Sequence, residues 1–365
     1  MMAMPLSLLL VTVLLLVFAA QSVAEGLFEE ALVVKKPRGD HGYRGIMGDF
    51  IALKDGSLLM SYTDGDIMVM RSADRGKTWG SPEVLVKRPV PQAKAYIAHP
   101  SFLRLADGQI LLTYIYSTHP ATPYFAHNYL RRSSDEGKTW SDPMCYTAYP
   151  GYVLVHNDRV SLLSTGRIMA AAEYKMYLPS SDDHSGFVGL SFYSDDNGVS
   201  WHPSGNVVDL YGEHVEVQEA DVVELKDGRL LMFARTYSGF PVFAYSEDKG
   251  ATWGPGIKRT DIRLPYAGLP TVRRMPNGDL LFIWITERSQ DKVNPKIHRR
   301  CTLTAAISKD EGATLTNYRN IASDPEDDFG YQCVEFVDEG TVLVGYHCRD
   351  GIRVARIGMD WFYGK

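Results

Sequence analysis

The sequence predicts an all-β protein, a six-bladed β-propeller built from four-stranded antiparallel blades. A short turn ending in glycine recurs six times between apolar runs, with its glycines at positions 56, 108, 166, 228, 278 and 340. A second motif, close to Ser-x-Asp-x-Gly-x-Thr/Ser-Trp, recurs five times, with its glycines at positions 76, 137, 198, 250 and 312. Repeats of 50–62 residues with four predicted strands each are typical of one propeller blade per repeat.

Each repeat is predicted to hold two hairpins. Copies of the first turn such as LKDGSLLMSY and MPNGDLLFIW place Asp-Gly or Asn-Gly between apolar runs, which is the strongest short hairpin signal. The Ser-x-Asp motif marks the second hairpin of the same repeat. No helical periodicity and no linker interrupt this pattern, so the repeats use up the chain.

The Ser-x-Asp motif is interpreted as part of the frame. Its Asp can accept hydrogen bonds from N–H groups of the turn, its Gly takes a positive φ, and its Trp packs over the turn. Every blade needs such a tight hairpin, whereas a catalytic residue is not needed five times.

The two ends of the chain are predicted to close the ring. The sixth repeat lacks the Ser-x-Asp motif and ends GIRVARIGMDWFYGK, so it offers three strands. The run ALVVKK, which precedes the first repeat, is expected to supply the fourth strand.

Residues 1–24 are interpreted as a signal peptide. They form an apolar run that ends Ser22-Val23-Ala24, with small residues at the two positions that a signal peptidase reads. An N-terminal anchor helix is the alternative, although the run is short for a membrane span. We therefore expect a secreted or periplasmic protein with a single propeller domain over residues 25–365, in which no other stretch is long enough to span a membrane.

Composition limits the partners and cofactors. The formal net charge of −6 argues against nucleic acid as a partner. The four cysteines fit no zinc pattern, and no metal site or cofactor is predicted. Cys333 and Cys348 flank one predicted hairpin, so an exported chain could join them in a disulfide.

The predicted topology places both kinds of turn on one face of the ring and a pocket on the other. That other face carries the starts of the first and third strands of each blade. It gathers arginines, carboxylates, tyrosines and histidines, and His99, His156 and Arg159 are predicted there as substrate-binding residues. Clustered arginines suit a carboxylate, sulfate or phosphate, because guanidinium binds planar anions bidentately.

Motifs on this face resemble those of the sialidase (neuraminidase) superfamily, and the resemblance covers essentially the whole chain after residue 24. EADVVELKDGRLLMFAR resembles the family's Glu and Arg motif without a gap and carries Glu219 and Arg235. RCTLTAAISKDEG and GYQCVEFVDEG resemble two later motifs and carry Arg300 and Tyr331. GYRG carries Arg44, where the family has Tyr-Arg-Ile-Pro.

The resemblance implies a retaining exo-glycosidase that removes a terminal acidic sugar, such as a sialic acid, from a glycan. Arg44, Arg235 and Arg300 would bind the carboxylate of the sugar. Tyr331 would attack the anomeric carbon, and Glu219 would take its proton. An anionic nucleophile would be repelled by the carboxylate of the sugar, which accounts for the tyrosine.

The first repeat departs from the family pattern. Arg44 is not followed by Ile-Pro, and it lies eleven residues before the turn residue Asp55, a longer spacing than the family has. The acid/base Asp of the family lies in a long loop of the first blade. Here that loop is only TDGD, so the implied general acid is Asp64 or Asp66.

Two other functions fit the same residues. The histidines, including His99 and His156, could serve a different glycosidase, or a lyase that abstracts a proton beside a uronate carboxylate, since imidazole titrates near neutral pH. A non-catalytic glycan-binding propeller would keep the arginines and aromatic residues and lose the paired acid and nucleophile.

Overall fold

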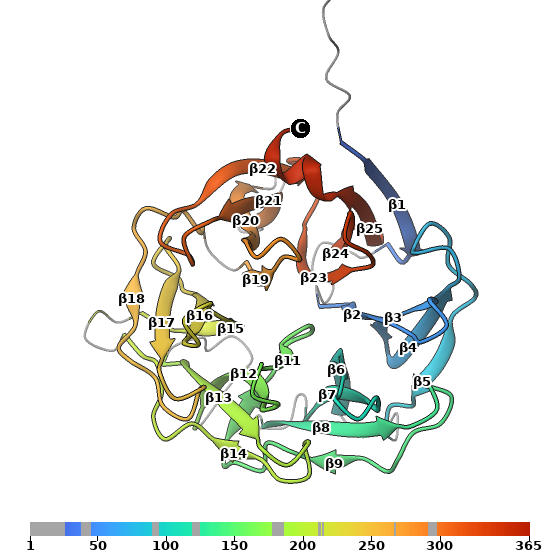
Figure 1. Ribbon diagram of the computed structural model, residues 1–365, viewed down its shortest axis with the longest axis horizontal. Coiled ribbons are helices and arrows are strands. Elements are labelled where there is room, and N and C mark those ends of the chain that lie inside the picture. The colour runs from blue at the N-terminus through green and yellow to red at the C-terminus, as the bar shows by residue number, and fades with distance from the viewer. Residues whose placement is uncertain are drawn as a thin grey trace, which may run out of the picture.

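The computed structural model describes residues 26–37, 45–89, 95–118, 125–176, 186–210, 213, 215–265, 268–290 and 298–365. The predicted signal peptide, residues 1–24, and Arg44 lie outside the described residues. The described chain forms antiparallel sheets arranged as a ring around a central axis, as Figure 1 shows. The predicted all-β propeller is thereby confirmed.

The strands of the blades follow the order of the repeats, and a short 3-10 helix, η2 (Met359–Tyr363), ends the chain. By blade, the strands are β2 (Met47–Ala52), β3 (Leu58–Asp64), β4 (Asp66–Ser72) and β5 (Glu83–Val86); β6 (Ala95–Arg104), β7 (Ile110–Thr118), β8 (Ala126–Ser133) and β9 (Met144–Cys145); β10 (Tyr152–Leu154), β11 (Val160–Leu162), β12 (Ile168–Lys175), β13 (Val188–Ser194) and β14 (His202–Pro203); β15 (Gln218–Glu224), β16 (Leu230–Arg235), β17 (Val242–Ser246) and β18 (Ile257–Lys258); β19 (Thr271–Arg274), β20 (Leu280–Gln290), β21 (His298–Ser308) and β22 (Thr316–Ser323); β23 (Gly330–Phe336), β24 (Thr341–Cys348), β25 (Gly351–Gly358) and β1 (Phe28–Lys35).

The sixth blade joins the two ends of the chain. Strand β1 pairs antiparallel with β25, from Phe28 opposite Ile357 to Lys35 opposite Gly351, and gives the order β1-β25-β24-β23. In Figure 1 the blue β1 lies beside the red β25. The prediction that a strand from each end closes the ring is confirmed.

The second and third blades are connected into one nine-stranded sheet. Their link is a single parallel pair between Tyr152 of β10 and Ala126 of β8. The first strand of the third blade is interrupted, because β10 and β11 both pair with β12 and residues 155–159 lie between them. The segment between β10 and β11 therefore leaves the sheet and reaches across the ring.

The released segment contacts blades on the far side of the axis. The side-chain amide of Asn157 donates to the carbonyl oxygens of Gly48 and Tyr331, both at 3.0 Å. Nη2 of Arg159 donates to the carbonyl oxygen of Pro270 at 2.6 Å, and the N–H of Val334 donates to the Asp158 carboxylate at 3.0 Å. Residues 156–159 therefore form a floor across the centre of the propeller.

The Ser-x-Asp motifs have the structural role that the sequence predicts. In the second blade, Asp135 accepts bonds from the N–H and the hydroxyl of Thr139 at 2.8 and 2.6 Å. The N–H of Gly137, whose φ is 78°, donates to the Ser133 hydroxyl at 2.8 Å. Trp140 donates its indole N–H to the carbonyl oxygen of Gly137 at 3.1 Å.

The residue before the motif glycine also links neighbouring blades. The carboxylate of Glu136 accepts bonds at 2.9 and 2.8 Å from Arg104 of its own blade, and one at 3.0 Å from the N–H of Lys54 in the first blade. Glu311 repeats this arrangement with Arg274 and with the N–H of Lys226. The motifs thus hold adjacent blades together as well as closing turns.

The hydrophobic core lies mainly between adjacent blades. Ile283 and Leu303 of the fifth blade, for example, pack with Val344 and Ala355 of the sixth, and all four are almost fully buried. Burying an aliphatic side chain of this size stabilises the fold by about 1.5–3 kcal/mol. Because strands of different repeats share each cluster, the ring is stabilised as one unit.

The four cysteines are free thiols. Cys333 lies opposite Gly345 and Cys348 opposite Gly351, so the disulfide considered between the two is not present. Among the described residues, no helix is long and apolar enough to cross a membrane.

Candidate active site

Three blades place a side chain near the axis by the same backbone feature. His99 of β6, Glu219 of β15 and Tyr331 of β23 have positive φ angles of 52°, 48° and 52°. In each blade the register between the first two strands shifts at this residue, which marks a β-bulge. Left-handed φ values are unfavourable for residues other than glycine and concentrate at functional sites.

The bulged residues share one position in the repeat. His99 and Tyr331 each lie nine residues before the turn glycine of their blade, as Glu219 does before Gly228. A bulge re-aims a side chain that regular strand alternation would point elsewhere. Sequence reasoning singled out all three residues without using this spacing, which is the signal that could have grouped them.

Tyr331 is the centre of an aromatic cluster. The ring centroids of His99, His156 and His347 lie 5.6, 6.0 and 6.1 Å from that of Tyr331. The rings of His99 and His156 are themselves 4.7 Å apart. Burial lowers the pKa of His99 well below its ordinary value, and the charges of nearby groups lower it further, so His99 is neutral at pH 7.

Glu219 and Arg235 form a buried ion pair. Oε2 of Glu219 lies 2.6 Å from Nη1 of Arg235, and the two side chains are only 5% and 6% exposed. Nη2 of Arg235 also donates to Gln218 at 2.5 Å and to the hydroxyl of Tyr237 at 2.8 Å. Burial opposes ionisation of the Glu219 carboxyl, but Arg235 and other nearby cations outweigh it and lower its pKa to about 2.

Arg300 approaches the same tyrosine from β21. Its guanidinium carbon lies 5.3 Å from the centroid of the Tyr331 ring, and the residue is 5% exposed. Within the described part of the chain, its Nε and Nη1 atoms have no hydrogen-bond partner. Buried polar groups normally have partners, so these charged donors are well suited to a bound anion.

Tyr331 itself is only 8% exposed. Burial raises the pKa of its phenol, and the nearby Glu219 carboxylate raises it further, while Arg300 and Arg235 lower it. The net shift is upward, so the phenol carries its proton at neutral pH and needs an acceptor if it is to act as a nucleophile.

Sequence reasoning did not assign a role to Glu173, at the end of β12. Its Oε2 accepts the N–H of Glu219 at 3.0 Å, and its Oε1 lies 3.6 Å from Nε2 of His156. Nε2 of His156 is also 4.0 Å from Oε1 of Glu219. Glu173 thus supports the bulge of Glu219, a contact between blades that no local sequence pattern reveals.

Arg159, which was predicted to bind substrate, forms hydrogen bonds within the propeller. Its side chain is fully buried, and its Nη1 donates to the carbonyl oxygen of Asp158 at 2.9 Å. Its Nη2 donates to Pro270 and, at 3.2 Å, to the hydroxyl of Thr271. These bonds anchor the floor segment to the fifth blade, a role that the sequence did not indicate.

The two predicted general acids lie in the tight turn between β3 and β4. The carboxylate of Asp64 forms an ion pair with Lys36 and is 49% exposed. Asp66 accepts the N–H of Arg88 at 2.7 Å. The structure describes contacts of these two carboxylates with Lys36, just after β1 of the sixth blade, and with Arg88, just after β5 of the first, and none with Tyr331.

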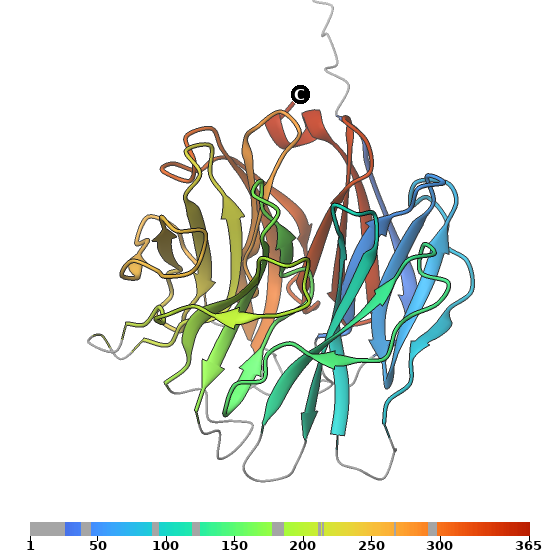
Figure 2. The ribbon, with the colours of Figure 1, turned by 60° about the horizontal axis from the view of Figure 1, so that its bottom comes forward.

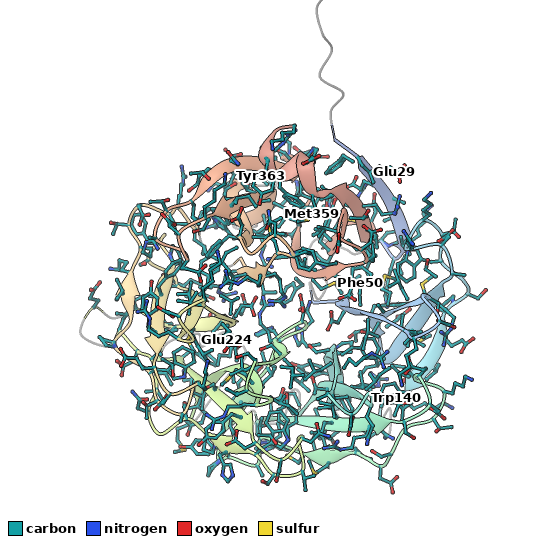
Figure 3. The ribbon with its side chains drawn as sticks, viewed as in Figure 1. Glu29, Phe50, Trp140, Glu224, Met359 and Tyr363 are labelled. Carbon is teal, nitrogen blue, oxygen red and sulfur yellow. The ribbon has the colours of Figure 1, made fainter. Side chains whose placement is uncertain are left out.

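A cavity of about 880 Å³ opens on the face of the ring that carries the turns between the first and second strands of the blades. The first strands of all six blades line this cavity and contribute, among others, Arg273 and Glu335. Asp158 and Arg159 of the floor segment also border it. Phe50 and Glu224, which also line it, lie close to the central axis in Figure 3. Figure 2 shows the turns at the top of the ring and the start of β6 at the bottom. The cavity is lined by the later parts of the first strands, for example Phe102 of β6 and Val334 of β23, whereas His99 and Tyr331 come earlier in these strands, toward the opposite face.

The repeats and the fold agree with a known family. A family model described as a BNR repeat-like domain matches residues 61–344. The chain belongs to this BNR repeat-like family. A sialidase of Micromonospora viridifaciens is 26% identical to this BNR repeat-like protein over 92% of the chain, and the chain spans 54% of the length of that sialidase.

Solved structures show the same fold. A protein of unknown function from Dyadobacter fermentans matches 91% of this BNR repeat-like chain and 99% of its own length, with a TM-score of 0.67 and 21% identity. The intramolecular trans-sialidase from Ruminococcus gnavus, solved in complex with oseltamivir carboxylate, matches 91% of the chain and 98% of its own length, with a TM-score of 0.64 and 15% identity. At these identities the likeness concerns the fold.

Proposed function

We propose that the protein is an exo-glycoside hydrolase that removes a terminal acidic sugar, a sialic acid or a related sugar, from a glycan with retention of configuration. The observation that carries the proposal is the grouping of a protonated tyrosine, Tyr331, with the Glu219–Arg235 ion pair and Arg300 in one buried cluster. A nucleophile, a carboxylate and two cations at one place match the needs of an acidic sugar.

The arginines are the proposed binding site for the carboxylate of the sugar. Nε and Nη1 of Arg300 are available donors, and Nε of Arg235 likewise has no hydrogen-bond partner among the described residues. Arg44, which lies outside the described residues, remains the predicted third arginine. Charge-assisted hydrogen bonds of this kind contribute about 1.5–3 kcal/mol each.

The proposed reaction forms a bond between Tyr331 and the sugar. The phenol oxygen attacks the anomeric carbon while its proton moves to Glu219, and the bond to the leaving oxygen breaks. The leaving oxygen takes a proton from the general acid, for which Asp64 and Asp66 stay the predicted candidates. Water then attacks the anomeric carbon and the bond to the Tyr331 oxygen breaks. The attacking water returns one proton to the general acid, and the phenolate recovers its proton from Glu219.

A second candidate function is a lyase acting on a uronate, which the three histidines around Tyr331 favour. A neutral His99 could accept the proton beside the uronate carboxylate. The electrons would form a carbon–carbon double bond as the bond to the leaving oxygen breaks, and Tyr331 could protonate that oxygen. Arg300 would bind the carboxylate in this reaction too.

The test is release of 4-methylumbelliferone from a sialoside, beside a panel of other glycosides and a uronide polymer. We expect turnover of the sialoside, abolished by Tyr331→Phe with binding of free sialic acid retained. Tyr318→Phe is the matched control, because Tyr318 is 52% exposed on an outer strand. NMR of the first product would show retained anomeric configuration.

The other outcomes separate the alternatives. An unsaturated product from the uronide, without release from any sialoside, would favour the lyase. Binding of sialic acid without turnover of any substrate, unchanged in Tyr331→Phe, would favour a glycan-binding propeller and would overturn the role given to Tyr331.

A further inference from the structure

His156 is a buried imidazole beside the nucleophile that the proposed reaction does not use. It is 4% exposed and begins the floor segment that crosses the axis. Neither ring nitrogen has a hydrogen-bond partner among the residues the structure describes. Buried ring nitrogens without a protein partner normally bind a ligand or a water molecule, or take up a proton.

The surroundings of His156 indicate the group with which it can exchange a proton. Nε2 lies 3.6 Å from Oε1 of Glu173 and 4.0 Å from Oε1 of Glu219. These two distances exceed the usual length of a formed hydrogen bond by roughly 0.6 and 1 Å. Catalytic hydrogen bonds are often long in an unliganded enzyme and shorten when the substrate binds, so a small movement would bring His156 onto Glu219.

Glu219 alone is a weak acceptor for the phenol proton. Chiefly its contact with Arg235, with smaller contributions from His156 and Arg300, lowers the pKa of its carboxyl to about 2, whereas the pKa of Tyr331 is raised. A proton placed on Glu219 would therefore be held poorly through the lifetime of the sugar–tyrosine intermediate. Imidazole, which ordinarily titrates near neutral pH, is a better place for it.

We propose that His156 is a positioning residue that holds the proton of Tyr331 while the sugar is attached to that tyrosine, and that it receives this proton through Glu219. The inference rests on the proposed hydrolase function and deepens it. Glu173, whose Oε1 lies near the same Nε2, would orient the ring and stabilise the imidazolium formed.

The proton balance closes over one cycle. In the first step the phenol oxygen bonds to the anomeric carbon, its proton passes to Glu219, and the proton of Glu219 passes to neutral His156. In the second step water attacks the anomeric carbon and the bond to the phenol oxygen breaks. The phenolate recovers the proton from His156 through Glu219, and the remaining proton of the attacking water returns to the base form of the general acid.

The charge on His156 then sets a pH dependence. Among the described residues, the titratable groups that face it are His99 from β6, Glu173 from β12, Glu219 from β15 and Tyr331 from β23. Protonation of His156 by the solvent would block this transfer, so kcat should fall toward acidic pH; this fall is the acidic limb of the pH profile. Without His156, this acidic limb should move to lower pH, where Glu219 titrates.

The test compares pH profiles of the wild type and His156→Gln on the 4-methylumbelliferyl sialoside. We expect kcat to fall about 100-fold on the plateau with KM close to wild type, and the acidic limb to move to lower pH. Glu173→Gln should lower kcat by less and should leave the acidic limb of the pH profile where it is in the wild type. His202→Gln is the control, because His202 lies exposed on β14 beside Tyr193.

A second measurement, on ligand binding, tests the same role independently of turnover, in case the substitution disturbs the fold. Calorimetric titration with free sialic acid, in buffers of different ionisation enthalpy, should show proton uptake by the wild type at pH 7, because the bound carboxylate adds negative charge beside His156. Uptake should be lost in His156→Gln. An unchanged acidic limb or unchanged uptake in a folded variant overturns the role of His156, whereas absence of both binding and turnover in the wild type overturns the proposed function first.

Discussion

Asn157 and Tyr331 come from blades on opposite sides of the ring, and the side-chain amide of Asn157 donates a 3.0 Å hydrogen bond to the carbonyl oxygen of Tyr331. The same amide donates to the carbonyl oxygen of Gly48 at 3.0 Å, and Asn157 is fully buried. The unfavourable φ of Tyr331, 52°, therefore lies next to a bond that fixes its main chain.

The first prediction concerns this bond. Asn157→Leu keeps the side-chain volume but leaves two buried carbonyl oxygens without a donor, which costs about 1–3 kcal/mol for each. We expect a lower free energy of unfolding in urea and a lower kcat, since Tyr331 loses its support. Asn320→Leu, at an exposed site on β22, should cost less than about 1 kcal/mol, because the Thr304 hydroxyl that it accepts at 3.0 Å also has Thr286 as a partner at 2.6 Å. Equal effects of the two substitutions would contradict the role of Asn157.

Arg300 should matter for ligand binding more than for folding. Arg300→Lys keeps the charge but removes the planar pair of donors, so the dissociation constant for sialic acid should rise roughly 10-fold or more. The measurement is calorimetric titration, with thermal unfolding as the check on the fold. Arg71→Lys, an exposed substitution on β4, is the control. Retained affinity in Arg300→Lys would show that the anion binds elsewhere.

The predicted general acids can be tested separately through the leaving group. A general acid matters most for a poor leaving group, so Asp66→Asn or Asp64→Asn should lower kcat about 100-fold on an alkyl-linked sialoside. The loss on the 4-methylumbelliferyl sialoside should be much smaller. Asp142→Asn, at an exposed position, provides the control. Equal losses on both substrates, or none, would remove the tested residue from this role.

Glu335 should make the stability depend on pH. Burial and, to a smaller extent, the charge of Asp158 raise the pKa of its carboxyl to about 7, although the N–H that Ala52 donates to the carboxylate at 3.1 Å acts in the opposite direction. A raised pKa means that the folded state prefers the protonated acid. Its contribution to stability is therefore present below about pH 4.5 and is lost as the pH rises to about 7.

Glu335→Gln should remove this dependence. The variant should match the wild type near pH 4 and be more stable at pH 8 by about 2 kcal/mol, since one pKa unit corresponds to about 1.4 kcal/mol and the side chain is partly exposed. Urea unfolding at the two pH values measures the difference. Glu339→Gln, exposed in the same blade, is the control. A variant that is less stable than the wild type at pH 8 would contradict the assignment.

Local signals in the sequence were enough to predict the architecture. Hairpin turns at residues 56, 108, 166, 228, 278 and 340 and the Ser-x-Asp motifs each depend on a few neighbouring residues. Closure by β1 was also predictable, because the sixth repeat lacked one strand and ALVVKK was unused. The residues Glu219, Arg235, Arg300 and Tyr331 were recognised from motifs, and the structure groups them.

The sequence by itself thus determined the ring, its repeats and the residue types of the site, because turn geometry and strand alternation are encoded locally. Only the tertiary structure decided that residues 156–159 cross the axis, that Arg159 anchors this floor, and that Glu173 and His156 meet Glu219. These contacts join blades that are far apart in the chain. They depend on how the closed ring sets inner strands against one another, and no short stretch of sequence records that packing.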